Sequence, residues 1–313
     1  MSAVAEVVFR FWTHATVEYA YYRGFGSAGA RWVRPRVVVG TGPWYRTSRD
    51  TTRKTAHNMF VTLRKKYDAT IVLLSDVEEA SYEETATLYA HKLMKWEPPD
   101  AVISGGARVL KRWGKGTKRQ STPHLIQCGN REGKDLILAA TTVEEGCEAW
   151  EKRINMRFHE AGFNRDSYIK SCTLMGACFY AAEYAEVPLK GTTIKIAKDK
   201  FEAHIRRIKK AAKKVERDGK TATTKDTLAK VKADGLGGRD AAQTLSNLMV
   251  QARICEMLGD GVSVRYVRDW KLPGADGVVE FRTTWSAGYY LQDLVRRRPY
   301  LLAAEDTGFQ DLI

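Results

Sequence analysis

The feature that most restricts the fold of this chain is an alternation of apolar runs with helix-patterned stretches between residues 36 and 142. Apolar runs of strand length occupy 36–40, 70–76 and 100–106. Apolar residues at helical spacing fill 48–66, and an Ala-, Leu- and Met-rich helical stretch fills 81–96. This order of strand and helix is typical of an α/β unit, in which helices cover a sheet.

The pattern changes towards the C-terminus. Further strand-like runs occupy 124–128 and 135–142, after which helical stretches dominate. The predicted elements beyond 143 are helices over 144–162, 167–185, 199–217 and 239–258, a short strand over 192–197, and a hairpin that joins 262–267 to 277–285. The expected fold class is mixed α/β, with an α/β-patterned N-terminal half followed by a mainly helical C-terminal half.

Composition shifts suggest three regions. Residues 1–34 form an aromatic N-terminal helix and arm, 35–143 the α/β-patterned region, and 144–313 a mainly helical region. The last region includes a basic helix and loop at 198–232 and a C-terminal tail. We find no internal repeat and no low-complexity linker between them.

The chain is strongly basic, with 51 Lys and Arg against 37 Asp and Glu and a net charge of +14. This balance favours polyanionic partners such as nucleic acid, an anionic membrane surface or phosphorylated substrates. The sequence lacks an apolar run long enough for a transmembrane helix and lacks signal-peptide features. We therefore expect a cytoplasmic or nuclear protein, or one within a virion, that is neither secreted nor membrane-bound.

The five cysteines show no metal-binding spacing, so no zinc site is expected, and the favoured interpretation includes no metal or cofactor. Their odd number favours buried, reduced thiols. None of the six histidines lies in a catalytic motif.

The positive charge is concentrated in 198–232, where thirteen Lys or Arg face five Asp or Glu. One helix face carries an apolar stripe formed by Phe201, Ile205, Ile208, Ala212 and Val215. The opposite face carries Arg206, Arg207, Lys209, Lys210, Lys213, Lys214 and Arg217. Like charges one turn apart repel each other, which favours a bound polyanion, although a solvated helix face is the alternative.

Two further basic clusters extend this pattern. The segment 107–124 has no acidic residue and places Trp113 among cations, as in surfaces that bind single-stranded nucleic acid. Its candidate binding residues are Arg108, Lys111, Arg112, Trp113, Lys115, Lys118 and Arg119. The segment 40–54 follows a strand and opens a helix, and it adds Arg46, Arg49, Arg53 and Lys54. For 107–124 the alternative is a basic loop whose Trp113 packs into the core, and for 40–54 the alternative to a wider basic surface is a nucleotide site.

A catalytic reading centres on Asp76, which ends the apolar run 70–76, with Glu78 and Glu79 close behind. Ligands of α/β sheets bind at the carboxyl ends of strands, where such carboxylates could hold Mg²⁺ or act as bases. The alternative is that Asp76 caps the following helix and the glutamates lie at its positive end.

The sequence favours a nucleic-acid-binding protein, for RNA or single strands, that contacts the phosphate backbone without sequence preference. A self-assembling nucleocapsid or coat protein, and hence a homo-oligomer, is one form of this hypothesis. The alternative is an α/β enzyme that acts on a phosphate-bearing or nucleic-acid substrate.

Overall fold

The computed structural model describes most of the chain between residues 38 and 292. The described residues are 38–41, 50–67, 70–106, 110–114, 124–162, 169–219, 223–268, 270–274, 277–281, 288, 289 and 292. The chain divides into two compact units, residues 1–79 and 80–313. Helices and a mixed parallel and antiparallel sheet confirm the predicted α/β class.

The first unit contains a strand–helix–strand motif. Strand β1 (Val38–Thr41) pairs in parallel with β2 (Thr70–Leu73), and helix α4 (Asp50–Tyr67) connects them. Phe60 and Leu63, three positions apart on α4, are both buried. This motif agrees with the alternation of apolar and helical segments in the sequence.

The second unit is built on a six-stranded sheet of order β5-β4-β3-β6-β8-β7. Its strands are β3 (Ala101–Gly105), β4 (Leu110–Gly114), β5 (His124–Ile126), β6 (Ser171–Gly176), β7 (Thr192–Thr193) and β8 (Ser263–Val267). Strands β3, β4 and β5 form an antiparallel meander, whereas β6 and β8 run parallel to β3. The carboxyl ends of β3, β6 and β8 therefore meet at one edge of the sheet.

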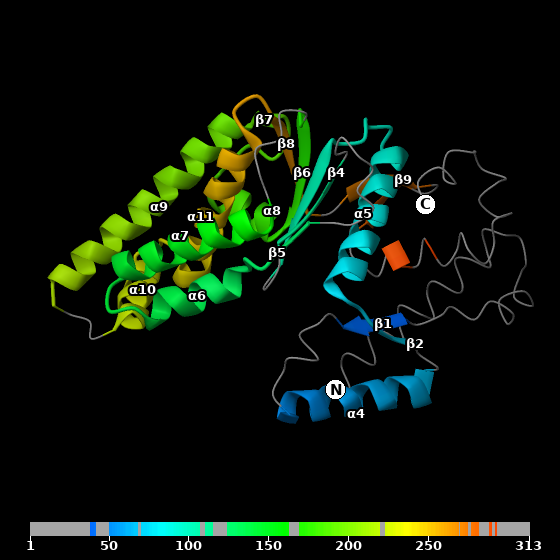
Figure 1. Cartoon of the computed structure of the whole chain (residues 1–313), viewed down its shortest axis with the longest axis horizontal. Coiled ribbons are helices and arrows are strands. Elements are labelled where there is room, and N and C mark those ends of the chain that lie inside the picture. The colour runs from blue at the N-terminus through cyan, green and yellow to red at the C-terminus, as the bar shows by residue number, and fades with distance from the viewer. Residues whose placement is uncertain are drawn as a thin grey trace, which may run out of the picture. The chain divides into compact units, whose positions relative to one another are not determined.

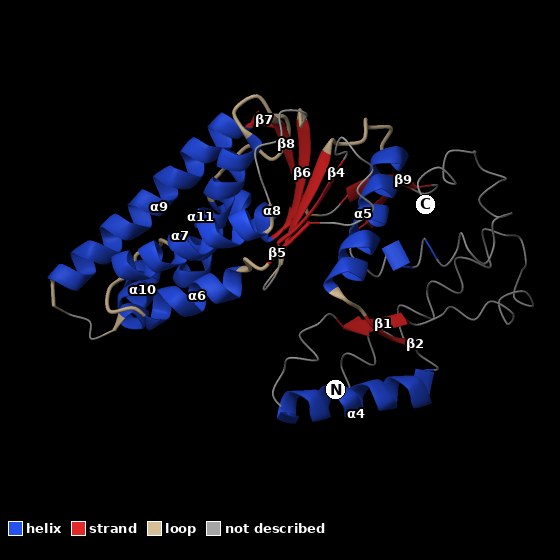
Figure 2. Cartoon of the chain, viewed as in Figure 1, coloured by secondary structure: helices blue, strands red, loops and turns tan. Residues whose placement is uncertain are grey.

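Helices cover both faces of this sheet (Figures 1 and 2). One face carries α6 (Asn130–Ala139), α7 (Val143–Glu160), α8 (Ala177–Tyr184), α9 (Ile194–Arg217), α10 (Thr224–Ala233) and α11 (Ala241–Leu258). The opposite face carries α5 (Asp76–Leu93), on which Ala80 packs against Val102 and Met175. No helix in the described part of the chain is long and apolar enough to cross a membrane.

Three predicted elements differ from the structure. The run 167–185, predicted as one core helix, is strand β6 followed by α8. A central strand is buried on both faces, so it shows the same continuous apolar run as a buried helix. The predicted strand at 135–142 lies largely in α6, and most of the predicted strand at 192–197 belongs to α9.

The predicted hairpin between 262–267 and 277–285 is also wrong in its pairing. Strand β8 joins the central sheet, where it pairs with β6. The hairpin is formed by β9 (Trp270–Gly274) and β10 (Gly277–Phe281). The first strand of the hairpin therefore begins three residues after β8 ends.

Candidate functional site

Two glycines bring the ends of β3 and β6 together. Gly105 and Gly176 are paired across these parallel strands. Gly176 has a φ of 61°, and a Cβ at this position would lie 2.4 Å from the carbonyl oxygen of Gly105. Only glycine combines a left-handed backbone with so close an approach, so a side chain here would force the two strands apart.

Two helices begin beside these strand ends with their first turn uncapped by a side chain. Gly176 is the N-cap of α8, and Gly129 is the N-cap of α6. Neither residue supplies a side-chain hydrogen bond to the first helical N–H groups. Free N–H groups at a helix N-terminus, together with the helix dipole, attract anions such as phosphate.

These features surround a pocket with a volume of 510 Å³. Its lining residues are Gly105, Gly106, Asn130, Gly176, Ala177, Tyr180, Arg239, Asp240, Gln243, Thr244 and Asn247. They come from the loop after β3 and from the N-terminal parts of α6, α8 and α11. The strand ends and three helix starts thus contribute to one concave surface.

The amide of Asn130 is the group in this pocket that most clearly lacks a partner. The residue is only 8% exposed, and its side-chain Oδ1 has no hydrogen-bond partner. Its backbone carbonyl accepts a hydrogen bond from the Ser246 hydroxyl at 3.2 Å, which fixes the start of α6 against α11. A buried polar atom without a partner is costly, and Oδ1 is a hydrogen-bond acceptor, so it is suited to accept a hydrogen bond from a water molecule or from a donor group of a ligand in the pocket.

The carboxylate of Asp240 caps a helix and forms an ion pair. Its Oδ1 accepts a hydrogen bond from the Gln243 N–H and caps α11, while Oδ2 lies 2.6 Å from the Lys134 ammonium. Burial raises the pKa of Asp240, but the hydrogen bonds from Lys134 and the helix start outweigh it, and the net pKa is lowered. Asp240 therefore remains ionised and is not suited to act as a general base near neutral pH.

The rim of the pocket carries an aromatic ring and a cation. Tyr180 on α8 is 51% exposed, and Arg239 just before α11 is exposed. The guanidinium of Arg268 lies 5.7 Å from the centre of the Tyr180 ring. The rim thus offers positive charge to an anionic ligand and a flat apolar surface beside it.

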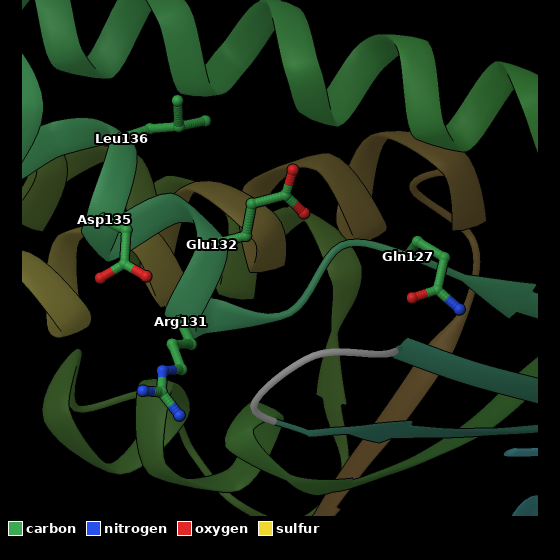
Figure 3. Close-up of a pocket in the computed structure, with 5 residues that line it drawn as sticks. All are labelled: Gln127, Arg131, Glu132, Asp135 and Leu136. Atoms are coloured by element: carbon green, nitrogen blue, oxygen red, sulfur yellow. The ribbon is translucent and has the colours of Figure 1, made fainter. Parts of the chain in front are cut away.

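A second hollow of 620 Å³ lies along α6 and is lined by Gln127, Arg131, Glu132, Asp135 and Leu136 (Figure 3). The carboxylates of Glu132 and Asp135 point in different directions (Figure 3). Glu132 lies 3.6 Å from the Arg153 guanidinium. No group of three or more potential metal ligands occurs among the described residues. We therefore place the candidate site at the strand ends.

Comparison with known proteins gives a fold. No protein-family model and no curated protein matches the sequence. A Ppx/GppA family member from Aquifex aeolicus has a similar structure, with a TM-score of 0.56 and 13% identity over 95% of this chain and 83% of that one. An exopolyphosphatase from Cytophaga hutchinsonii gives 0.54 and 9% over 94% and 82%. The chain shares their fold.

This similarity corrects the function predicted from the sequence. The hypothesis of an RNA-binding nucleoprotein that assembles into a capsid is wrong, because the structural neighbours are exopolyphosphatase-type proteins. The nucleic-acid partner and the nucleoprotein oligomer are wrong for the same reason. An exopolyphosphatase-like protein with 11% identity over 80% of this chain and 78% of that one, at a TM-score of 0.50, agrees with this correction. The findings fit the alternative, an α/β enzyme with a phosphate-bearing substrate, better.

The predicted binding residues before 120 are only partly described. Arg46, Arg49, Arg108, Lys115, Lys118 and Arg119 lie outside the described residues. Arg53 and Lys54 lie on α4, where Lys54 is exposed. Lys111, Arg112 and Trp113 lie on strand β4, so these residues do not form the basic loop given as the alternative for this cluster.

The basic residues of 206–217 are fully described on α9. The apolar stripe is confirmed, because Phe201, Ile208 and Ala212 are completely buried. Lys209 lies 2.5 Å from the Glu144 carboxylate, and Arg206 lies 3.5 Å from the Glu202 carboxylate. Burial lowers the pKa of Lys209, but the hydrogen bond to Glu144 and nearby negative charge outweigh this effect and raise it.

The acidic residues considered for catalysis lie at the start of α5. Ser75, rather than the predicted Asp76, caps this helix, because its hydroxyl accepts a hydrogen bond from the Glu78 N–H at 3.2 Å. The Glu78 carboxylate in turn accepts hydrogen bonds from the N–H and hydroxyl of Ser75, at 2.7 and 2.8 Å. This reciprocal pair is a capping box, so Glu78 stabilises the helix start.

Sequence reasoning missed Asn130, Gly176 and Asp240. The prediction of one helix over 167–185 gave Gly176 no special role. A glycine inside an apolar run can, however, mark a change from strand to helix. Asn130 had no signal of its own, because its importance depends on burial beside α11.

Proposed function

We propose that this chain is a phosphohydrolase that binds a phosphate group of its substrate in the pocket at the ends of β3 and β6. One observation carries the proposal: two uncapped helix starts, two closely packed glycines and the unpartnered amide of Asn130 all border this pocket. Backbone N–H groups in this arrangement bind phosphate oxygens and stabilise the charge that develops during phosphoryl transfer.

The fold suggests the bond that is cleaved. Two of the structural neighbours are described as an exopolyphosphatase and an exopolyphosphatase-like protein, so inorganic polyphosphate is the first substrate to test. In such a hydrolysis, water forms a bond to the terminal phosphorus while the bridging P–O bond breaks, and orthophosphate leaves. The pocket would hold the terminal phosphate during this exchange.

The test is phosphate release from long-chain polyphosphate, tripolyphosphate and nucleoside triphosphates, with and without Mg²⁺. Replacement Asn130→Ala should reduce kcat/KM about 10-fold or more, because the acceptor oxygen that would orient the attacking water is lost. Gln127→Ala, at an exposed position outside this pocket, should leave the rate unchanged. Thermal unfolding of both variants separates loss of activity from loss of fold.

Two results would contradict the proposal. The first is a folded wild-type protein that releases no phosphate from any of these substrates. The second is an Asn130→Ala variant with unchanged kcat/KM, which would place the phosphate elsewhere.

A further inference from the structure

We propose that the exposed side of α9 is a docking surface for a linear phosphate chain. The α9 outer face consists of Arg207, Lys210, Lys213, Lys214 and Arg217, all of which are exposed. The inference rests on the proposed function for its link to hydrolysis, whereas the binding it predicts can be measured separately.

Helical geometry gathers these five cations on one side. Arg207, Lys210, Lys214 and Arg217 follow one another at spacings of three, four and three residues, which places them along one side of a helix. The opposite side carries Phe201, Ile208 and Ala212, which are buried in the core. The helix is therefore anchored by its apolar stripe, and the outer face is held in position without any ligand.

The outer face differs from Lys198, Arg206 and Lys209 on the same helix because its charges are not neutralised by ion pairs. Lys209 pairs with Glu144, and Arg206 lies 3.5 Å from Glu202. Lys198 lies 3.7 Å from Glu202 and 3.5 Å from Glu256. Within the described part of the chain, no ion pair involves the five outer-face residues. Like charges one turn apart repel each other, and an acidic ligand would remove this repulsion.

The spacing and composition of the surface fit a phosphate chain. A helix rises ~1.5 Å per residue, so successive cations are about 5 Å apart and the face is about 15 Å long. A flexible chain with a negative charge on every unit can contact each cation in turn. The segment 206–217 contains no aromatic residue, so the outer face offers nothing on which a nucleic-acid base could stack.

The position of α9 predicts a consequence for substrate choice. Figure 1 shows that α9 begins beside β7 and that its C-terminal end extends away from the sheet. The candidate pocket lies at the ends of β3 and β6 instead. A surface separate from the pocket raises the local concentration of long substrates but does nothing for short ones. We therefore expect chain-length selectivity in KM and no effect on kcat.

The binding experiment uses fluorescent long-chain polyphosphate in a salt series. The triple variant Lys210→Gln, Lys213→Gln, Lys214→Gln should bind it about 10-fold more weakly, and the slope of log affinity against log salt should fall by about two. The control Lys65→Gln, Lys152→Gln, Lys190→Gln removes the same charge at exposed positions outside α9 and should bind like the wild type. Unfolding temperatures show whether both variants fold.

The kinetic experiment separates this inference from the proposed function. The outer-face variant should raise KM for long-chain polyphosphate about 10-fold and leave hydrolysis of tripolyphosphate unchanged. Chain binding that depends on the outer face in a protein without hydrolysis would support the docking surface and contradict the proposed function. Hydrolysis with an unchanged KM and unchanged chain binding in the variant would overturn the docking surface alone. Equal affinity for single-stranded RNA of matched charge would also overturn it, since the surface would not select a phosphate chain.

Discussion

Two ionisable side chains on α5 have pKa values shifted in opposite directions. Burial raises the pKa of Glu84 from 4.5 to about 7. Burial lowers the pKa of His91 from 6.5 to about 4; the hydrogen bond with the Glu97 carbonyl opposes this shift, and the charge of Arg265 adds a smaller lowering. The His91 ring lies 3.2 Å from the Thr173 hydroxyl and packs at 4.9 Å against the Trp270 ring.

These shifts predict opposing effects of pH on stability. Folded Glu84 holds its proton more tightly than unfolded Glu84, so its contribution is present below pH 4.5 and is lost as pH rises to about 7. Folded His91 resists protonation, so its contribution is present above pH 6.5 and is lost as pH falls to about 4. Between pH 4.5 and 6.5 the two effects partly cancel in the wild type.

Replacement Glu84→Gln should remove the contribution of Glu84 to the pH dependence of stability and leave that of His91. We expect its free energy of unfolding, measured by denaturant titration, to rise with pH between 4.5 and 6.5 more steeply than that of the wild type. The difference between the two proteins should change by about 3 kcal/mol across pH 4.5 to 7, because one pKa unit corresponds to ~1.4 kcal/mol.

His91→Gln provides the complementary measurement, since the free energy of unfolding of this variant should fall as pH rises from 4.5 to 7. Parallel pH profiles for the wild type and Glu84→Gln would show that Glu84 titrates normally in the folded protein.

At the level of elements, α6, α7 and α11 pack so closely that glycine is required at the contact. A Cβ on Gly133 would lie 2.1 Å from the Ser246 hydroxyl and 2.3 Å from the Trp150 ring. The Trp150 indole N–H donates a hydrogen bond to the Ser246 carbonyl at 3.3 Å, so movement of either residue would weaken this hydrogen bond. This contact fixes α6, and with it Asn130, against α11.

Gly133→Ala should therefore destabilise the protein by about 1–3 kcal/mol, because overpacking forces buried side chains from their positions. Gly261→Ala is the matched control, since a Cβ there meets nothing within 4 Å and the residue does not have a positive φ. The control should change the free energy of unfolding by less than about 0.5 kcal/mol. Equal stability of the two variants in denaturant titration would contradict the close packing.

At the scale of the whole molecule, one core cluster holds all five cysteines. All five cysteines are free and buried, and all belong to the core on the sheet face that carries α6 to α11. They are Cys128, Cys147, Cys172, Cys178 and Cys255. Burial raises the pKa of Cys128, Cys147 and Cys178 to about 12. The predicted buried, reduced thiols are thus confirmed.

We expect all five thiols to react with a disulfide reagent such as DTNB only as fast as the core opens. In native buffer the reaction should be slower than that of a free thiol by about 100-fold or more, because both access and thiolate formation are restricted. Above the denaturant midpoint five thiols should react rapidly. Fast reaction of one thiol in native buffer would reveal local opening of the core.

Local pattern predicted much of the fold. Continuous apolar runs predicted β1, β2 and β3, and helical spacing or helix-favouring composition predicted α4, α5, α7 and α11. They failed at β6 and α8, where burial on all sides removes the periodicity. They also failed at α6, where the apolar residues from 136 to 138 resemble a short strand.

The candidate site was less predictable than the fold. The sequence directed attention to exposed cations, since charge is visible in composition, and α9 carries them as expected. The pocket instead depends on Gly105, Gly176 and Asn130, which come from separate segments and carry no charge. Their significance arises from strand pairing and from a buried amide without a partner, neither of which local sequence expresses.

The sequence by itself determined the α/β class, the amphipathic basic helix and the buried thiols, because each depends on residue type and spacing along the chain. Only the tertiary structure decided which strands pair, which helix starts meet at the ends of β3 and β6, and which lysine on α9 is neutralised by Glu144. These properties depend on contacts between residues distant in sequence, for which local patterns of hydrophobicity and charge hold no information.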